Sequence, residues 1–355
     1  MPTATDANRT KRSRSSRRSP HWWARLPDDE LLDLRICDLA LDIEGTPLER
    51  RIQRLYQELA RQGLRFKPHC WLSDEWFAPD DIPGIAIPFY LAHPRLVRLE
   101  DQMMLEVEGG SHHWCMQLLR HEAGHAYETA YQLGRRKKWK RTFGKASKPY
   151  PEFYKPRPFA RNYVLHLGWW YSQSHPCEDF AETFAVWLAP RSKWQKRYAD
   201  WPALRKLNYT DELMAELAGR APKVRSRAKE WPLSRIKTTL REYYEKKQER
   251  HGSQYPDFYD RDLKRLFPLP ANPGDAPAAA AYLRRLEPEL RQLVARWTGE
   301  YNYTVDLVLK DMIKRCRELD LRVARTEADL KAEAAVMLTM QTMNFVYSTE
   351  HKVAL

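Results

Sequence analysis

The chain has little glycine and little cysteine for its length. Its 355 residues include 13 glycines, and none is arranged as a phosphate-binding loop, which excludes the common glycine-rich nucleotide motif. The cysteines are odd in number, widely scattered and never spaced as C-x-x-C. We therefore expect free thiols, as in a cytoplasmic protein. The five cysteines are Cys37, Cys70, Cys115, Cys177 and Cys316.

Long apolar runs are also missing. No stretch approaches the roughly 18 apolar residues of a membrane-spanning helix, and the mean hydropathy is −0.72. Charged residues make up 30% of the chain. These values predict a soluble protein with no membrane partner. A hydrophobic content of 43% with 13 tryptophans still predicts a large packed core.

Acidic charge is scarce in two places. The formal net charge is +13, of which residues 1–20 contribute +5 and residues 135–161 contribute +10. The rest of the chain is therefore close to neutral. We expect residues 1–20 to be a disordered basic tail, because no apolar stretch follows that would make them a secretory signal. The Arg/Ser composition also resembles a transit peptide or a nuclear address.

The most informative stretch present is His121-Glu122-Ala123-Gly124-His125, an H-E-x-x-H motif. Residues four apart lie on one face of a helix, so both imidazoles can bind one metal ion. Glu122 lies about 100° round the helix and can take a proton from a metal-bound water. Ser111 is a candidate N-cap. Small apolar residues fall on the opposite face and predict close packing there: Leu119, Ala123, Ala126 and Ala130. The alternative is an amphipathic helix with two solvated histidines.

A second candidate helix follows Pro176 and ends before Pro190. Glu178 and Glu182 share one of its faces with two alanines, while Phe180, Phe184 and Trp187 form an apolar face. A catalytic zinc site needs three protein ligands and an open position. Glu178 is the candidate third ligand, and Glu182 the candidate acceptor for the second nitrogen of a ligating histidine. Alternatively, Glu178 is only a first-turn glutamate that interacts favourably with the helix dipole, and Glu182 is a surface charge. Cys177 is a weaker ligand candidate, since it points away from this face.

Together the two motifs resemble those of the gluzincin metallopeptidases, whose third zinc ligand is a glutamate on a second helix. The likeness is closer to a bacterial zinc-binding metallopeptidase family with a similar His-Pro-x-Glu-Asp-aromatic-Ala-Glu-Thr block, here residues 175–183. It extends over residues 30–190. A more distant motif likeness is to anthrax lethal factor, in which a tyrosine seven residues before the ligand glutamate assists at the oxyanion. Tyr171 stands at that position, although residues 169–171 could simply pack in the core. The resemblance implies peptide-bond hydrolysis and no particular substrate.

The two motif helices are connected by a basic insertion, residues 133–160. Aromatic residues interleave with its positive charges, as in proteins that bind single-stranded nucleic acid. The same pattern suits a lid that attracts acidic peptides, or a solvated loop. We predict that this insertion guides a polyanionic partner, either an acidic protein or nucleic acid. The residues predicted to do so are Arg135, Arg136, Lys137, Lys138, Lys140 and Arg141.

The remaining segments predict an α+β fold. Residues 28–40 have the pattern of a helix, and residues 46–49 that of a capping box that opens another. Short apolar runs at residues 64–66, 85–91, 96–99 and 104–107 predict a small sheet, with Pro88 at an edge or bulge. One of its edge strands could pair with an extended peptide substrate. Residues 267–277 have the composition of a linker, and residues 278–355 predict a helical C-terminal extension.

The sequence thus predicts a zincin-like, mostly helical metallopeptidase domain over residues 21–266. Its function would be that of a zinc-dependent peptidase with one Zn²⁺ per chain. His121, His125 and Glu178 would bind the metal, Glu122 would be the general base, Glu182 would support a ligand, and Tyr171 would donate to the oxyanion. Two alternatives stay open: a nucleic-acid-associated protein with a zinc site, and a non-catalytic zinc-binding scaffold or effector. The sequence does not indicate an oligomeric state.

Overall fold

The computed structural model describes residues 21–151, 154, 157, 160–167, 170–251, 259–267, 276–323 and 326–348. It is mostly helical with one small parallel sheet, as an α+β protein should be. The predicted tail, residues 1–20, lies outside the described residues, and so does most of the predicted linker. Within the described ranges, no helix has the length and apolarity needed to cross a membrane.

The first predicted helix, over residues 28–40, is wrong. The structure has a short helix, α1 (Asp28–Leu32), and a separate 3₁₀ turn, Ile36–Leu39. Between them the backbone turns away to bond with a distant segment. The Ile36 amide donates to the Thr238 carbonyl, and the Leu240 amide donates to the Leu34 carbonyl. These long-range bonds replace the helical ones that the apolar pattern alone had suggested.

The next helix, α2 (Pro47–Arg61), begins at the predicted capping residues. Thr46 Oγ1 accepts a hydrogen bond from the Glu49 amide at 3.3 Å. Glu49 reaches back to the Gly45 amide at 2.8 Å, one residue earlier than a standard capping box. The face of α2 that carries Leu48, Ile52, Leu55 and Leu59 is buried in the core.

The predicted sheet is smaller than expected. It consists of β1 (His69–Ser73) and β2 (Gly84–Pro88), which run parallel in the register His69 with Gly84 to Ser73 with Pro88. Pro88 ends β2, where its missing amide proton is least costly. The runs predicted as strands at residues 64–66, 96–99 and 104–107 are not strands. Residues 96–99 lie instead in α3 (Pro94–Met104), since Pro94 takes the first helical position, which proline favours.

The predicted substrate-pairing edge is partly covered. Ala86 of β2 pairs with Trp71 of β1 and also forms an antiparallel bridge with Phe77. The Ala86 amide donates to the Phe77 carbonyl at 2.8 Å. Phe77 therefore occupies the outer side of β2 at this point.

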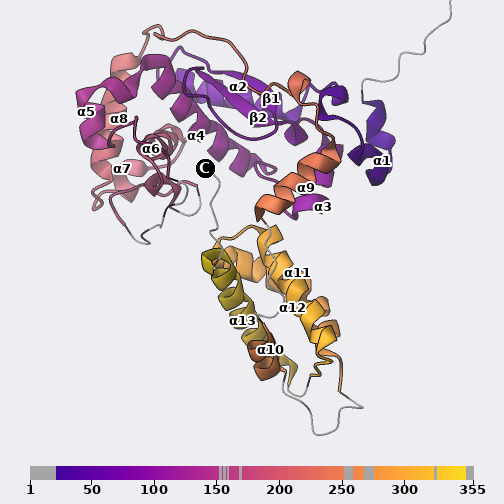
Figure 1. Ribbon diagram of the computed structural model, residues 1–355. Helices are drawn as coiled ribbons and strands as arrows, with labels where there is room; N and C mark the ends of the chain where they lie inside the picture. Colours follow the sequence, from indigo (N-terminus) through magenta and orange to yellow (C-terminus); the bar gives the residue numbers. More distant parts are fainter. Residues whose placement is uncertain are drawn as a thin grey trace, which may run out of the picture.

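The two motif helices form as predicted and pack against each other (Figure 1). The helix α4 (His112–Tyr131) begins after Ser111, whose hydroxyl accepts from the Trp114 amide at 3.1 Å. The helix α6 (Pro176–Leu188) is capped by the His175 ring, with Pro176 at its first position. Leu119, Ala123, Ala126 and Ala130 of α4 are buried, as are Phe180, Phe184 and Trp187 of α6.

The basic insertion is not a plain loop. It contains a 3₁₀ turn, Leu133–Arg135, followed by α5 (Lys137–Thr142). Trp139 and Phe143 are buried, with ring centroids 5.9 Å and 5.4 Å from that of Phe180 on α6. Two of the aromatics that interleave with the charges therefore belong to the core. Beyond α6 the chain adds α7 (Trp194–Arg197), α8 (Leu204–Leu217) and α9 (Leu240–His251).

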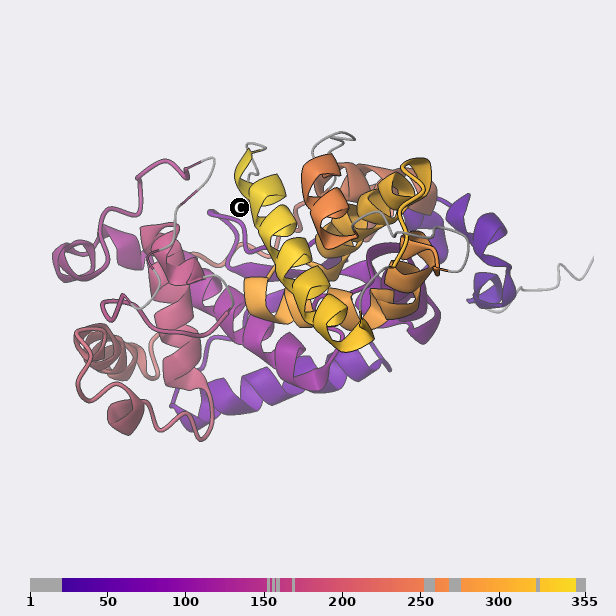
Figure 2. The same ribbon diagram turned by 90° about the horizontal axis from the view of Figure 1, so that it is seen from below.

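The described residues bury two large hydrophobic clusters. The first extends from Trp23 to Tyr244 and includes both motif helices. The second is formed by the C-terminal helices α11 (Ala279–Thr298), α12 (Asn302–Glu318) and α13 (Glu327–Ser348), together with α10 (Asp260–Leu266). Figures 1 and 2 show these four helices as a bundle beside the rest of the chain. The predicted boundary at residues 266/267 thus falls inside the second cluster.

Candidate metal centre

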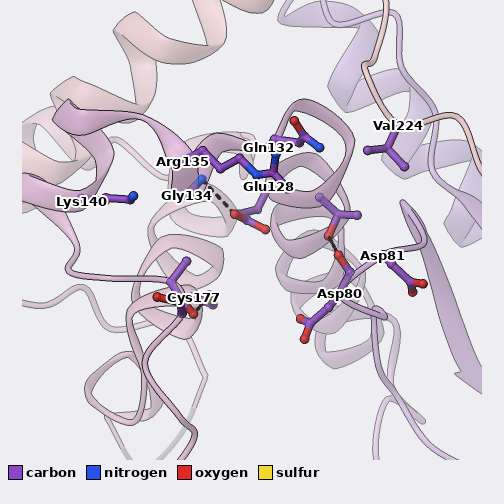
Figure 3. Close-up of a pocket in the computed structure, with 12 residues that line it drawn as sticks. Asp80, Asp81, Glu128, Gln132, Gly134, Arg135, Lys140, Cys177 and Val224 are labelled. Carbon is purple, nitrogen blue, oxygen red and sulfur yellow. Dashed lines mark hydrogen bonds between the residues drawn. The ribbon is translucent and has the colours of Figure 1, made fainter.

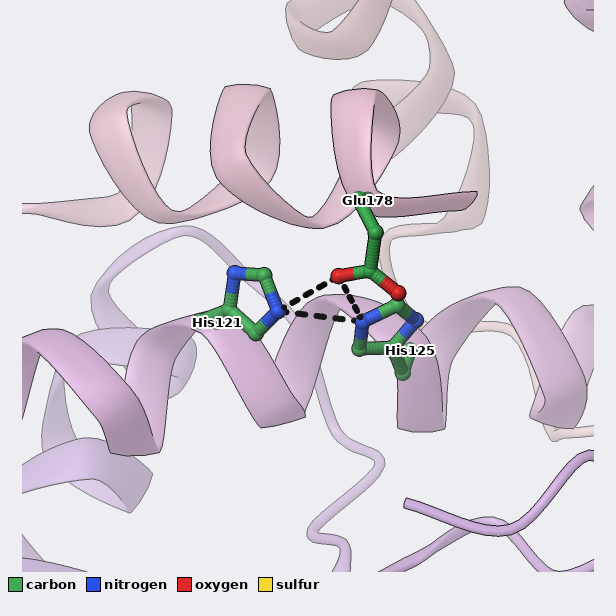
Figure 4. A group of neighbouring side chains, drawn as sticks. All are labelled: His121, His125 and Glu178. Carbon is green, nitrogen blue, oxygen red and sulfur yellow. Dashed lines mark hydrogen bonds and ion pairs between the residues drawn. The ribbon is translucent and has the colours of Figure 1, made fainter. Parts of the chain in front are cut away.

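The structure brings three of the predicted ligands together. His121 and His125 project from one face of α4 toward α6, and Glu178 projects from the first turn of α6 toward them (Figure 4). Glu178 Oε2 lies 3.0 Å from Nε2 of His121 and 3.1 Å from Nε2 of His125. The two Nε2 atoms are 3.1 Å apart. One atom of each residue thus points at a common centre.

This donor set fits a divalent metal ion. His121, His125 and Glu178 form the group of side chains, within the described residues, that could hold one. Ligand atoms bound at about 2.0–2.1 Å around a tetrahedral ion lie about 3.3 Å apart. The observed separations need to widen by only a few tenths of an ångström. Two nitrogens and one oxygen are common zinc ligands.

Glu182 fixes the orientation of His121. Its Oε1 lies 2.8 Å from His121 Nδ1, and its Oε2 accepts the Leu167 amide at 2.9 Å. Because a carboxylate only accepts, the proton of a neutral His121 sits on Nδ1. In this neutral form, which is the one that binds a metal ion, the lone pair is on Nε2, and Nε2 faces Glu178 and His125. Glu182 therefore lies where the sequence placed it, one helical turn after Glu178, and it also anchors the loop that carries Leu167.

Electrostatics favour a cation at this centre. Burial opposes a charge on His121, but hydrogen bonds to Glu178 and Glu182 outweigh it and raise the pKa of His121 well above its usual range. Burial likewise raises the pKa of Glu178, but the nearby His125 and His121 lower it well below its usual range. Each of these two groups is stabilised by opposite charge and is itself buried: His121 is 3% exposed and Glu178 4%.

Glu122 lies beside the triad without joining it. It is buried, with 7% of its surface exposed, and it is not one of the three residues whose ligand atoms converge. Burial raises the pKa of Glu122 above its usual value, although His121 and His125 act in the opposite direction. A carboxylate held in this way binds a proton more readily than a solvated one, as a general base requires.

Tyr171 lies against the metal triad. Its ring centroid is 5.6 Å from that of His121. It begins a short 3₁₀ turn, Tyr171–Gln173, after Trp170, whose φ of +52° reverses the chain. Burial and the charge of Glu178 raise the pKa of Tyr171 well above its usual range. Its hydroxyl therefore keeps its proton and can act as a donor.

A second tyrosine at the site was missed from the sequence. Tyr150 donates a 2.9 Å hydrogen bond to Glu178 Oε1. It lies 28 residues before Glu178, in the basic insertion, among several other aromatic residues. No spacing rule connects it to either motif. Only the path of the chain past the start of α6 brings the two side chains together.

The six predicted basic residues differ in whether they are already paired with acidic residues. Arg136 donates to both carboxylate oxygens of Glu216 on α8, at 2.7 and 3.1 Å. Lys138 pairs with Glu212 on the same helix. Arg135 and Lys140 line a cavity, while Lys137 and Arg141 are exposed on or beside α5. The acidic residues of α8 thus already neutralise part of the positive charge.

That cavity has a volume of about 510 Å³, and its lining residues do not include His121, His125 or Glu178. Its lining comes from the second half of α4, the start of α6 and the turn before β2 (Figure 3). Glu128 follows His125 by three residues on α4, and Cys177 directly precedes Glu178. Asp80 and Asp81 add two further carboxylates. Both signs of charge therefore face the same space.

Comparison with known proteins identifies no relative: no family model, no curated protein and no solved structure matches this chain.

Proposed function

We propose that this protein is a zinc-dependent peptidase. One observation carries the proposal: His121, His125 and Glu178 converge through Nε2, Nε2 and Oε2 at 3.0–3.1 Å. Glu122 lies next to them and Glu182 bonds to the far nitrogen of His121. A site meant only to stabilise the fold would be expected to use four protein ligands. Three ligands with a buried carboxylate beside them leave room for a substrate group.

The roles of the side chains follow from their chemistry. A bound Zn²⁺ would polarise the scissile carbonyl and lower the pKa of its water from about 15.7 toward 7. Glu122 would take a proton from the attacking water and return it to the nitrogen of the leaving amine. Tyr171 would donate its hydroxyl proton in a hydrogen bond to the developing oxyanion. Glu182 would keep the His121 proton on Nδ1 throughout.

The decisive experiment tests cleavage and metal together. Purified protein should cleave members of a diverse peptide library, and a chelator should abolish the cleavage. Glu122→Gln should lose turnover while keeping its zinc, because the carboxamide cannot take a proton and position 122 is not a ligand. Glu128→Gln is the matched control, because it makes the same chemical change on the same helix. Position 128 lines the cavity, and this variant should keep measurable turnover. Full activity in Glu122→Gln, or loss of its metal, would show that the assigned role is wrong.

A further inference from the structure

The two oxygens of the Glu178 carboxylate have separate partners. Oε1 accepts the hydroxyl of Tyr150 at 2.9 Å. Oε2 faces the Nε2 atoms of His121 and His125 at 3.0 and 3.1 Å. The tyrosine thus meets the carboxylate on the side away from the two imidazoles.

His175 holds the Tyr150 ring in place. The two rings stack with centroids 3.8 Å apart and an interplanar angle of 22°. His175 Nδ1 accepts the Cys177 amide at 3.2 Å, so its proton is on Nε2, which donates to the Lys148 carbonyl at 2.7 Å. One ring therefore caps α6, fixes the chain two residues before Tyr150, and supports the Tyr150 side chain.

Residues 144–151, which we name the strap, lie along the start of α6. Gly144 has a φ of +117°, and a Cβ there would lie 3.0 Å from Cγ of Pro176. Ala146 accepts a weak contact from the Cys177 thiol at 3.9 Å. The strap is thus in contact with the same helical turn that carries Glu178.

We propose that Tyr150 is a positioning residue for Glu178, holding Oε1 so that Oε2 alone meets the metal. This inference rests on the proposed metal site. The last torsion of a glutamate side chain is broad, so an untied carboxylate can present either oxygen or both. A tied carboxylate binds through one oxygen and leaves a coordination position open. Groups that orient metal ligands in this way typically contribute about 10–100-fold to metal affinity or activity.

The test removes one oxygen atom. Tyr150→Phe deletes the hydroxyl and keeps the ring that stacks on His175. Zinc affinity is measured by competition with a chelator for the wild type, for Tyr150→Phe and for Tyr163→Phe. Tyr163 is the matched control, because its ring lies under Lys206 on α8, 4.0 Å from the Nζ atom, and no hydrogen bond between described residues joins its hydroxyl to the triad. We expect about 10–100-fold weaker zinc binding for Tyr150→Phe and unchanged binding for Tyr163→Phe.

Cobalt substitution distinguishes positioning from a structural role. Co²⁺ absorbs more weakly per ion when its coordination number rises above four. The visible bands of Co²⁺-loaded Tyr150→Phe should therefore be weaker than those of the wild type, because both oxygens of Glu178 can then bind. A purely structural role would lower the thermal stability of the metal-free protein and leave the cobalt spectrum unchanged.

Two failures can be told apart. Wild-type zinc affinity together with a wild-type cobalt spectrum in Tyr150→Phe overturns the role of Tyr150 and leaves the metal site intact. A wild-type protein that binds neither Zn²⁺ nor Co²⁺ overturns the metal site, and the proposed peptidase function with it.

Discussion

Gly124 of α4 faces Ala181 of α6 so closely that a Cβ at position 124 would lie 2.8 Å from the Ala181 Cα. The same Cβ would lie 3.2 Å from the Ala181 carbonyl oxygen. The atoms in the way belong to the backbone of α6, so no side-chain rotation can relieve the contact. This close approach allows Glu178, one turn before Ala181, to reach the histidines on either side of Gly124.

Gly124→Ala should therefore destabilise the protein, although alanine favours helices by about 1 kcal/mol over glycine. Overpacking a tight interface typically costs about 1–3 kcal/mol, and here it also pushes the ligand helices apart. We expect a lower free energy of unfolding in urea and weaker zinc binding. Ala181→Gly in the same background should not restore either quantity, since the nearest atom is the Ala181 Cα. A variant as stable as the wild type would contradict the observed contact.

The two glutamates of α6 should differ in their effect on the metal. Glu178→Ala removes a ligand and should abolish most of the zinc affinity. Glu182→Ala removes only the partner of His121 Nδ1 and should cost about 10–100-fold. Zinc titrations of the two variants measure the difference directly. A larger loss for Glu182→Ala would mean that the ligand is misassigned.

Purified protein should contain about one zinc per chain. Removing it should lower the melting temperature, because a ligand that binds only the folded state stabilises that state by mass action. The double variant His121→Ala/His125→Ala should have neither the zinc nor the metal-dependent shift in melting temperature. Metal analysis and thermal unfolding with and without chelator provide the test. Full retention of zinc in the double variant would falsify the site.

The basic residues should fall into two groups. Neutralising Arg135, Lys137, Lys140 and Arg141 to glutamine should weaken binding of a polyanion. For single-stranded DNA, the slope of log affinity against log salt should fall by about 0.7 for each lost contact. Acidic peptides should show the same direction if they bind the same surface.

Neutralising Arg136 and Lys138 is the control for that experiment, because both already pair with α8. It should change polyanion affinity little and stability by at most about 1 kcal/mol per pair. Equal polyanion affinities for the wild type and the four-residue variant, with DNA and with acidic peptide, would leave the insertion as a solvated segment.

The parts of the site carried by local spacing could be predicted from the sequence. His121 and His125 are one helical turn apart, as are Glu178 and Glu182, and helical geometry sets which face each residue occupies. The caps Ser111 and Thr46 also act locally. The packing of α4 against α6 could also be predicted, because the small residues on both helices permit a close approach.

Features that depend on distant parts of the chain could not be predicted. Residues 34–37 do not continue a helix, because their backbone groups form hydrogen bonds with residues 236–240. Tyr150 reached Glu178 because the chain passes the start of α6. Arg136 and Lys138 form ion pairs with Glu216 and Glu212, which lie 80 and 74 residues further along the chain. No periodicity or local motif encodes such pairings.

The placement of α10 decides where this chain can be divided. Leu263 and Leu266, just before the stretch that resembles a linker, and Phe267, its first residue, are buried in the second hydrophobic cluster. Burying such a side chain fully is worth about 1.5–3 kcal/mol. A fragment that ends after Leu266 would expose Leu263 and Leu266 to water and would remove them from the cluster that the remaining helices form. A fragment that ends before Tyr259 would keep the buried residues of each cluster together and would lose from the first cluster the packing of Tyr303 on α12. We expect this shorter fragment to be the more soluble of the two.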